Sequence, residues 1–374
     1  MSIIDTRGKK MSNILKELAD KGLVKPPSWL ANNVHYLTIM GSQAYAVSNK
    51  ESDFDLYAMV IPPKEDLFVH LKGEIIGFGA WEDDKIHKNR WRTWQQAHVF
   101  DPSALGGKGR EYDFQAYNIV DYFQLCADSN PNMIDSLFTS ESNVLHTTKI
   151  GQMVKDNRRL FLTKKCYHTF RGYAQKQLKK ARNTGAECPK IQAIRKFEDD
   201  HGISHTMTFE AVKAEMIEKT NPELANLSQL ELNEYLTMFT AGMTESKRFE
   251  SRKTFNVDVK FLYHLARLAD ECEQILELGD VDLQRSREYM KAIRRGDVSE
   301  KDLTEWYTVR DKNLEALYGS SKLPNSPNMQ AIKTLLFQCL EEHYGDLNIG
   351  VARQEREALA LVEIKAVLEK YNLQ

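Results

Sequence analysis

Two aspartates one residue apart are the strongest chemical signal in the sequence. Asp53 and Asp55 stand at the start of an apolar run that continues to Ile61. Because side chains on a strand alternate between its two faces, both carboxylates are expected on one face. Carboxylates side by side repel each other unless a cation lies between them. Oxygen ligands at this spacing suit Mg²⁺, which takes one or two protein carboxylates together with substrate phosphates.

A glycine and a serine precede this acidic pair. The apolar run from Tyr36 to Met40 ends at Gly41 and Ser42. Glycine lets the backbone approach a ligand closely, and free N–H groups at a turn or helix start bind phosphate oxygens, with the serine hydroxyl as a further donor. The stretch therefore predicts a strand, a turn and a second strand that join a phosphate site to a metal site. An exposed loop that solvates its own charges is the alternative.

The run Gly41-Ser42, followed by Ser52-Asp53-Phe54-Asp55-Leu56, resembles the signature of the DNA polymerase β-like nucleotidyltransferase superfamily. In that superfamily a Gly-Ser turn precedes an Asp-x-Asp strand. Later stretches resemble the YcgL-type predicted nucleotidyltransferases of bacteria and phages: Asn130-Pro131-Asn132 leading into Leu137-Phe138, residues 260–268, residues 292–296 and Leu323-Pro324. That family usually has a glycine where this chain has Ala46, which predicts a tighter or differently built turn.

The resemblance implies an α+β fold in two domains. Residues 1–150 would form a nucleotidyltransferase domain, a mixed sheet flanked by helices, and residues 151–374 an all-α domain that closes the active-site cleft. The length agrees, because 374 residues exceed the roughly 100–200 residues usual for one domain. Residues 185–255 match the family poorly, and they are either an insertion that shapes acceptor specificity or a lid.

A third carboxylate is expected on a later strand, because members of the superfamily place one facing the first two. Residues 110–119 alternate aromatic and polar side chains as a half-buried strand does. Asp113 is the best-placed acid, Glu111 shares its strand face, and Asp121 is the least favoured of the three. A surface acid on an edge strand is the alternative.

Lys260, His264 and Arg267 recur at positions i, i+4 and i+7, which is one face of a helix. The resemblance places this face opposite the metal carboxylates, where Lys260 and Arg267 would bind the β- and γ-phosphates of an NTP. His264 would donate to phosphate or help to activate an acceptor hydroxyl. A partly buried structural histidine is the alternative.

A basic helix is predicted over about residues 158–183, where lysines and arginines are interleaved with aromatic residues. Such a mixture can hold a triphosphate, stack a base or follow a nucleic-acid backbone. The alternative packs the aromatic rings into the core and leaves the lysines in water. A partner contact is expected only for some of Tyr167, His168, Arg171 and Tyr173.

Charge and cysteine content narrow the class of protein. The net charge of −2 argues against a generally basic nucleic-acid coat but not against a local basic patch. The five cysteines are scattered without a Cys-x-x-Cys pair, as in proteins that keep their thiols reduced in a cytosol. No apolar run approaches the roughly 18 residues of a membrane span, so a cytoplasmic protein with no membrane partner is expected.

The sequence therefore predicts a nucleotidyltransferase that moves an NMP from an NTP to an acceptor hydroxyl and releases pyrophosphate. Asp53, Asp55 and Asp113 would hold Mg²⁺ or Mn²⁺, and Gly41 and Ser42 would orient the triphosphate. The acceptor stays open between an RNA 3′ end such as that of tRNA, a protein hydroxyl and a small molecule. The alternative is a non-catalytic nucleotide-sensing or interaction protein, which would gain support if no acid at 111, 113 or 121 faced the pair.

Overall fold

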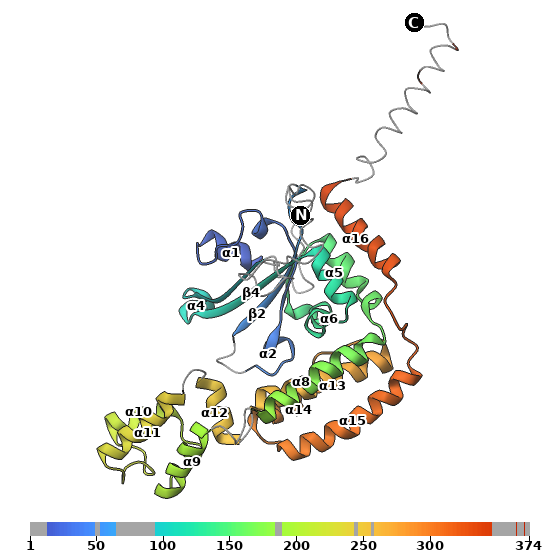
Figure 1. The fold of residues 1–374 in the computed structure, drawn as a ribbon. Coiled ribbons are helices and arrows are strands. Elements are labelled where there is room, and N and C mark those ends of the chain that lie inside the picture. The colour runs from blue at the N-terminus through green and yellow to red at the C-terminus, as the bar shows by residue number, and fades with distance from the viewer. Residues whose placement is uncertain are drawn as a thin grey trace, which may run out of the picture.

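A five-stranded mixed sheet forms the centre of the N-terminal part of the chain (Figure 1). The computed structural model describes residues 13–48, 53–64, 94–183, 189–242, 246–255, 258–345, 364 and 370. The strands are β1 (Val34–Ile39), β2 (Phe54–Val60), β3 (Trp94–Asp101), β4 (Arg110–Asn118) and β5 (Val144–Thr147), in the order β3-β4-β2-β1-β5. β2 and β4 run parallel, and the other neighbouring strands run antiparallel. This mixed sheet, followed by a helical region, confirms the predicted α+β class.

Each face of the sheet has its own apolar cover because side chains alternate along the strands. Leu56 and Phe114 point into a core that includes helix α1, whereas Tyr57 and Tyr117 point into a larger core shared with α5, α6 and α7. The helices and turns of this part are α1 (Ile14–Asp20), α2 (Gly41–Ala44), α4 (Ala104–Gly107), α5 (Ile119–Ala127), α6 (Pro131–Phe138) and α7 (Lys149–Asp156). Asn130 caps α6 and Pro131 occupies its first turn, where the missing proline N–H costs no helix bond.

The second half of the chain is helical. Its elements are η3 (Arg158–Phe161), α8 (Lys165–Asn183), α13 (Val259–Leu278), α14 (Arg287–Arg295), α15 (Glu300–Ser320) and α16 (Met329–Tyr344). The basic helix predicted over residues 158–183 is thus divided, and at the break the Thr163 hydroxyl accepts a hydrogen bond from the Lys165 N–H (3.2 Å). This local side-chain bond caps α8 and separates it from the short turn before it.

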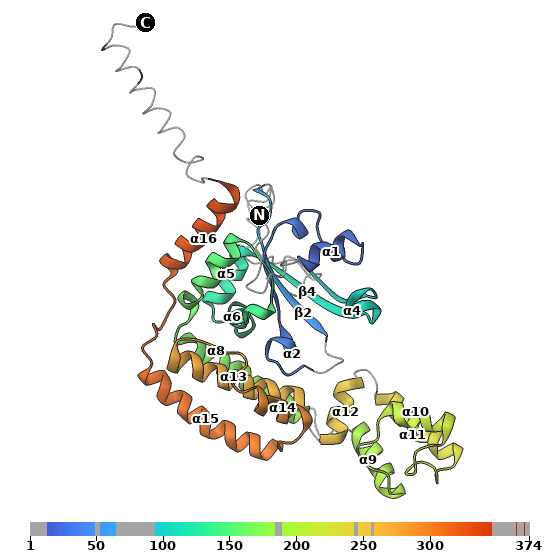
Figure 2. The same ribbon diagram turned by 180° about the vertical axis from the view of Figure 1, so that it is seen from behind.

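Helices α8 and α13 lie side by side, and α15 packs against both (Figures 1 and 2). The larger core continues from the sheet without a break through α8 and α13 to α16. Helix α13 begins at Asp258, whose side chain accepts a hydrogen bond from the Lys260 N–H (3.0 Å), and it ends at Gly279. This cap sets Lys260 in the first turn, at the end of α13 nearest the sheet's acidic residues.

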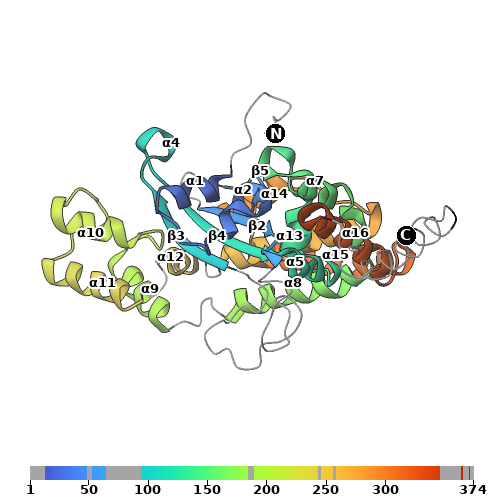
Figure 3. The same cartoon turned by 90° about the horizontal axis from the view of Figure 1, so that it is seen from above.

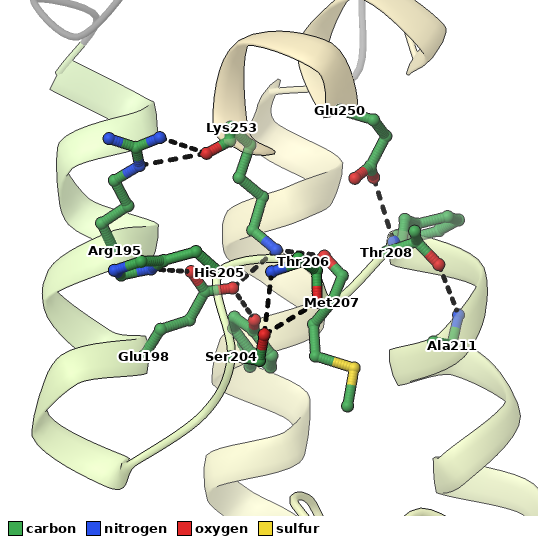
Figure 4. A network of polar contacts seen from close by, with 12 residues as sticks. Arg195, Glu198, Ser204, His205, Thr206, Met207, Thr208, Ala211, Glu250 and Lys253 are labelled. Atoms are coloured by element: carbon green, nitrogen blue, oxygen red, sulfur yellow. Dashed lines mark hydrogen bonds and ion pairs between the residues drawn. The ribbon is translucent and has the colours of Figure 1, made fainter. Parts of the chain in front are cut away.

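Residues 189–255 form a helical unit with its own core, at the opposite end of the molecule from α16 (Figure 3). Its helices are α9 (Pro189–His201), α10 (Phe209–Glu218), α11 (Gln229–Gly242) and α12 (Ser246–Phe255). Inside it Lys253 forms a fully buried ion pair with Glu198 (2.6 Å; Figure 4). Tyr235 donates a hydrogen bond to the same carboxylate. Buried charges of this kind need all their partners, so the network fixes how these helices pack.

Among the helices described here, none has both the length and the apolar composition needed to cross a membrane.

Candidate active site

Two of the predicted carboxylates lie opposite each other on one face of the sheet, and a third precedes one of their strands. Asp55 of β2 lies directly opposite Asp113 of the parallel strand β4, and neighbouring strands are about 4.8 Å apart. Both side chains lie on the face that carries Tyr57 further along β2, which is the face covered by the helical region. Asp53 immediately precedes β2 and is exposed. The sheet therefore gathers acids from two strands whose pairing the sequence alone does not specify.

The electrostatics of this group favour a cation. The pKa of Asp55 is raised to about 6, mainly by burial, and the nearby charges of Asp113 and, more weakly, Asp53 contribute in the same direction. The ammonium of Lys260 acts in the opposite direction and lowers the pKa. A half-buried carboxylate repelled by two others is costly to ionise, and a bound cation removes that cost.

The backbone of Gly41 lies against the Asp55 carboxylate. A Cβ atom at this position would lie 1.8 Å from Asp55 Oδ2, and Gly41 has φ +61°, so only glycine fits. The neighbouring Met40 N–H donates to the Asp55 carbonyl (2.7 Å). The predicted phosphate turn, including Ser42 at the start of α2, is thus held next to the predicted metal carboxylates.

His98 also lies at the site, although no sequence pattern predicted it as a site residue. The register of β3 against β4 shifts between Gln96 and Val99, and in this bulge His98 takes φ 56°. Its N–H donates to Asp113 Oδ1 (2.7 Å), and its Nδ1 lies 2.5 Å from Glu111 Oε1. Bulges re-aim side chains and occur often beside active sites. The one local signal is that polar residues interrupt the alternation expected of a strand.

The two other acids considered for the third position have different surroundings. Glu111 is bonded to His98, and this hydrogen bond is the main reason that the pKa of His98 is raised. Ligand atoms of His98, Glu111 and Asp113 lie within 4.8 Å of one another, a group that could hold a metal ion. Asp121 lies beyond the opposite end of β4, buried in the first turn of α5 and bonded to Asn118. The geometry therefore favours Asp113 as the third carboxylate.

The three residues predicted to share one face of α13 have different surroundings in the structure. Lys260 is exposed in the first turn, where its charge acts on Asp55. His264 is half-buried one turn later, with its ring 4.9 Å from that of Tyr263. Arg267 is only 6% exposed, and its guanidinium binds Asp135 of α6. Lys260 thus faces the carboxylates, whereas Arg267 is engaged in the packing of the fold.

Arg267 nevertheless acts on the site through Tyr45, which follows α2. Arg267 Nη1 donates to the Tyr45 hydroxyl (2.6 Å), which itself donates to Asp135 Oδ2 (2.7 Å). Two more residues of the helical region hold the same segment: Gln284 Nε2 donates to the carbonyl of residue 44 (3.2 Å), and Arg294 Nη1 donates to that of residue 47 (2.6 Å). The Gly-Ser turn is therefore fixed from the helical side.

The turn retains a glycine-like backbone at Ala46. Its φ is 53°, in the left-handed region that glycine adopts without strain. An alanine in this region costs about 1 kcal/mol. The contacts from Gln284 and Arg294 hold the residues on either side of this strained position.

The sequence is similar to one protein family and to one phage protein. Residues 9–193 match the family RlaP, described as the RNA repair pathway DNA polymerase beta family. The chain is also 24% identical over 277 residues to the "Uncharacterized 38.9 kDa protein in nrdC-mobD intergenic region" of Enterobacteria phage T4, covering 64% of this chain and 76% of that protein. No solved structure matches the chain significantly. The family match includes the acids of the sheet and the Gly-Ser turn, whereas α13 lies outside it.

Replacing Asp55 with asparagine is expected to stabilise the metal-free protein at neutral pH. The pKa of about 6 in the folded chain exceeds the ordinary value of 3.8. The folded state therefore binds the proton more tightly, and its free energy of unfolding falls as pH rises from about 4 to 6. Urea unfolding in EDTA should show a gain of the order of 2 kcal/mol for Asp55→Asn at pH 7.5 and none at pH 4. A loss of stability at pH 7.5 would contradict this account.

Replacing Arg267 with methionine is expected to destabilise the protein by about 3–5 kcal/mol, because Asp135 and Glu271 would remain buried without a cation. Urea unfolding measures the loss. Arg295→Met is the matched control, since its partner Asp297 and the arginine itself are mostly exposed, and its effect should stay within about 0.5 kcal/mol. Equal effects of the two substitutions would show that the buried cluster is not needed.

Proposed function

We propose, on the premise that residues 9–193 form a domain of the DNA polymerase β-like nucleotidyltransferase superfamily, that this chain is a metal-dependent nucleotidyltransferase. It would transfer an NMP from an NTP to an acceptor hydroxyl and release pyrophosphate. The observation that carries the proposal is the pairing of Asp55 with Asp113 across parallel strands, beside Asp53 and in contact with a glycine turn. A protein that only sensed nucleotides would have no physical reason to keep three mutually repelling acids together.

The donor set fits a hard divalent cation. Asp53, Asp55 and Asp113 offer carboxylate oxygens, which Mg²⁺ and Mn²⁺ prefer, and a bound cation would offset the burial and the like charges that raise the pKa of Asp55. When bound, the metal would act as a Lewis acid on the phosphoryl oxygens. His98 and Glu111 border the same group and would help to fix the orientation of Asp113 through the His98 N–H.

The residues of the chain itself would then have separate roles. Gly41 and Ser42 would orient the triphosphate, and Lys260 would neutralise the charge that develops on the leaving pyrophosphate. Asp113 would receive the proton of the acceptor hydroxyl. His264 stays a candidate for a phosphate contact, whereas Arg267 would act indirectly by fixing the turn through Tyr45.

An RNA hydroxyl is the acceptor that the comparisons favour. The matched family is described by its place in an RNA repair pathway, and a 3′-terminal RNA hydroxyl, such as that of tRNA, is a nucleophile of the required kind. Protein hydroxyls and small molecules would then be poor acceptors. Such an acceptor is consistent with a chain of net charge −2 only if a local surface supplies the positive charge.

Labelling with each α-³²P-NTP tests the reaction. The purified protein is incubated with Mg²⁺ or Mn²⁺ and, in parallel, with cellular RNA, protein and small-molecule extracts. Label is expected in RNA, and Asp53→Asn or Asp113→Asn should reduce it by at least about 100-fold without lowering the melting temperature. Asp121→Asn is the matched control, because this acid lies away from the site and its pKa of about 7 lets a neutral amide replace it easily.

Two results would overturn the proposal. Labelling that survives Asp53→Asn and Asp113→Asn, or that is lost equally in Asp121→Asn, would remove these acids from the chemistry. Absence of label in every fraction, with NTP binding still measurable by calorimetry, would favour a nucleotide-sensing protein on the same fold.

A further inference from the structure

One face of α8 carries a line of basic residues with an exposed aromatic ring among them. Lys165, Thr169, Tyr173, Lys176 and Lys180 recur at intervals of three or four residues, so they lie in a row along one side of the helix. The row extends for about 22 Å from its first lysine to its last. We call it the α8 basic row.

The contacts of α8 show where this row points. At its first end Lys165 Nζ lies 2.7 Å from Asp128, at the end of α5, so the row lies on the side of the sheet domain. The other side of α8 faces α15, where Arg171 binds both oxygens of Asp311 (2.5 and 2.7 Å). The two sides of α8 therefore have different neighbours.

The far end of the row lies against the first turn of α13, which carries Lys260. Lys180 Nζ lies 5.7 Å from the centre of the Phe261 ring in the first turn of α13. Phe261 follows Lys260, whose charge acts on the Asp55 carboxyl group. A chain of phosphates bound along the α8 basic row would therefore end beside the acids of the sheet.

The fold uses most of the basic and aromatic residues on α8, but not those in the middle of the row. Tyr167 is buried and stacks on Tyr318 of α15, with ring centres 4.7 Å apart. Tyr173, in contrast, is 43% exposed, and Lys176 Nζ lies 5.3 Å from the centre of its ring. Among the residues that the structure describes, no carboxylate pairs with Lys176. An exposed ring and an ammonium group side by side can stack a base and bind its phosphate.

We infer that the α8 basic row binds the single-stranded 3′ end of the acceptor RNA and leads its terminal hydroxyl to Asp113. Tyr173 stacks on a base, and Lys176 and Lys180 bind backbone phosphates. The inference rests on the proposed function, since the acceptor must reach the carboxylates. The row would give a chain whose net charge is −2 the local positive surface that RNA binding needs.

Equilibrium binding separates this inference from the chemistry. Fluorescence anisotropy of a labelled single-stranded 12-mer RNA is measured with the full chain in EDTA and about 100 mM salt, where no transfer occurs. Lys176→Glu and Tyr173→Ala should each raise Kd by about tenfold or more, and Lys176→Glu should reduce the slope of log K against log salt by about one. Asp53→Asn should bind the RNA at least as tightly as the natural chain.

Lys312→Glu is the matched control, because Lys312 is exposed, carries the same charge and lies on α15, which packs against the other side of α8. The Kd of this control should change less than twofold. Thermal unfolding checks that the variants fold. Equal weakening of RNA binding by Lys312→Glu and Lys176→Glu would show an effect of net charge alone and overturn the inference, as would equal competition by polyglutamate and unlabelled RNA.

The outcomes also distinguish this inference from the proposed function. If NTP label reaches RNA but Tyr173→Ala and Lys176→Glu bind RNA normally, the reaction stands and the α8 basic row is not the acceptor site. If those variants lose RNA binding while no label is ever transferred, the RNA surface stands and the nucleotidyltransferase assignment fails.

Discussion

The buried cluster around Arg267 is the constraint on which the candidate site depends. Its guanidinium joins Asp135 of α6, Tyr45 after the Gly-Ser turn and Glu271 one turn along α13. Burial raises the pKa of both carboxyls, which favours a protonated carboxyl beside the cation over two buried anions. Removing one member leaves a buried charge without a partner, so the three segments are held in one arrangement. The turn that faces Asp55 is therefore positioned by residues far from it in the sequence.

A second constraint couples the two halves of the site. Gly41 touches the Asp55 carboxylate, so the turn cannot move without moving the acid against which it packs. A triphosphate bound at the turn and a cation bound at the acids would thus lie at a fixed separation, which is what in-line transfer requires. The cost is paid in the metal-free state, where the acids repel one another and burial disfavours their ionised form. Under the proposed function, a bound cation would stabilise both the fold and the reactive geometry.

Sequence patterns predict the parts of this site that depend on local periodicity. The period of two along a strand places Asp53 and Asp55 on one face, and alternation in residues 110–119 predicts β4 and its acids. Periodicity does not say which strands are neighbours, so only the register of β4 against β2 shows that Asp113 lies opposite Asp55. His98 was missed because a bulge breaks the strand pattern. Helix periodicity also predicts which residues share a face but not how deeply each is buried. Lys260 and Arg267 share one face of α13, yet they lie about 10 Å apart along the helix. Lys260 is exposed to solvent, whereas Arg267 is buried in the core.

The same argument explains why composition could not assign the basic helix. Basic and aromatic residues occur on every side of this helix, and only the packing of the neighbouring helices decides which of them are buried. Helix α15 takes up Tyr167 and Arg171 through ring stacking and a carboxylate, so these residues stabilise the fold. Tyr173 and Lys176 stay exposed on the side that leads to Lys260. A chain with almost no net charge can therefore have a positive surface on one side. That surface is formed by the basic side chains that the fold does not pair with acidic ones.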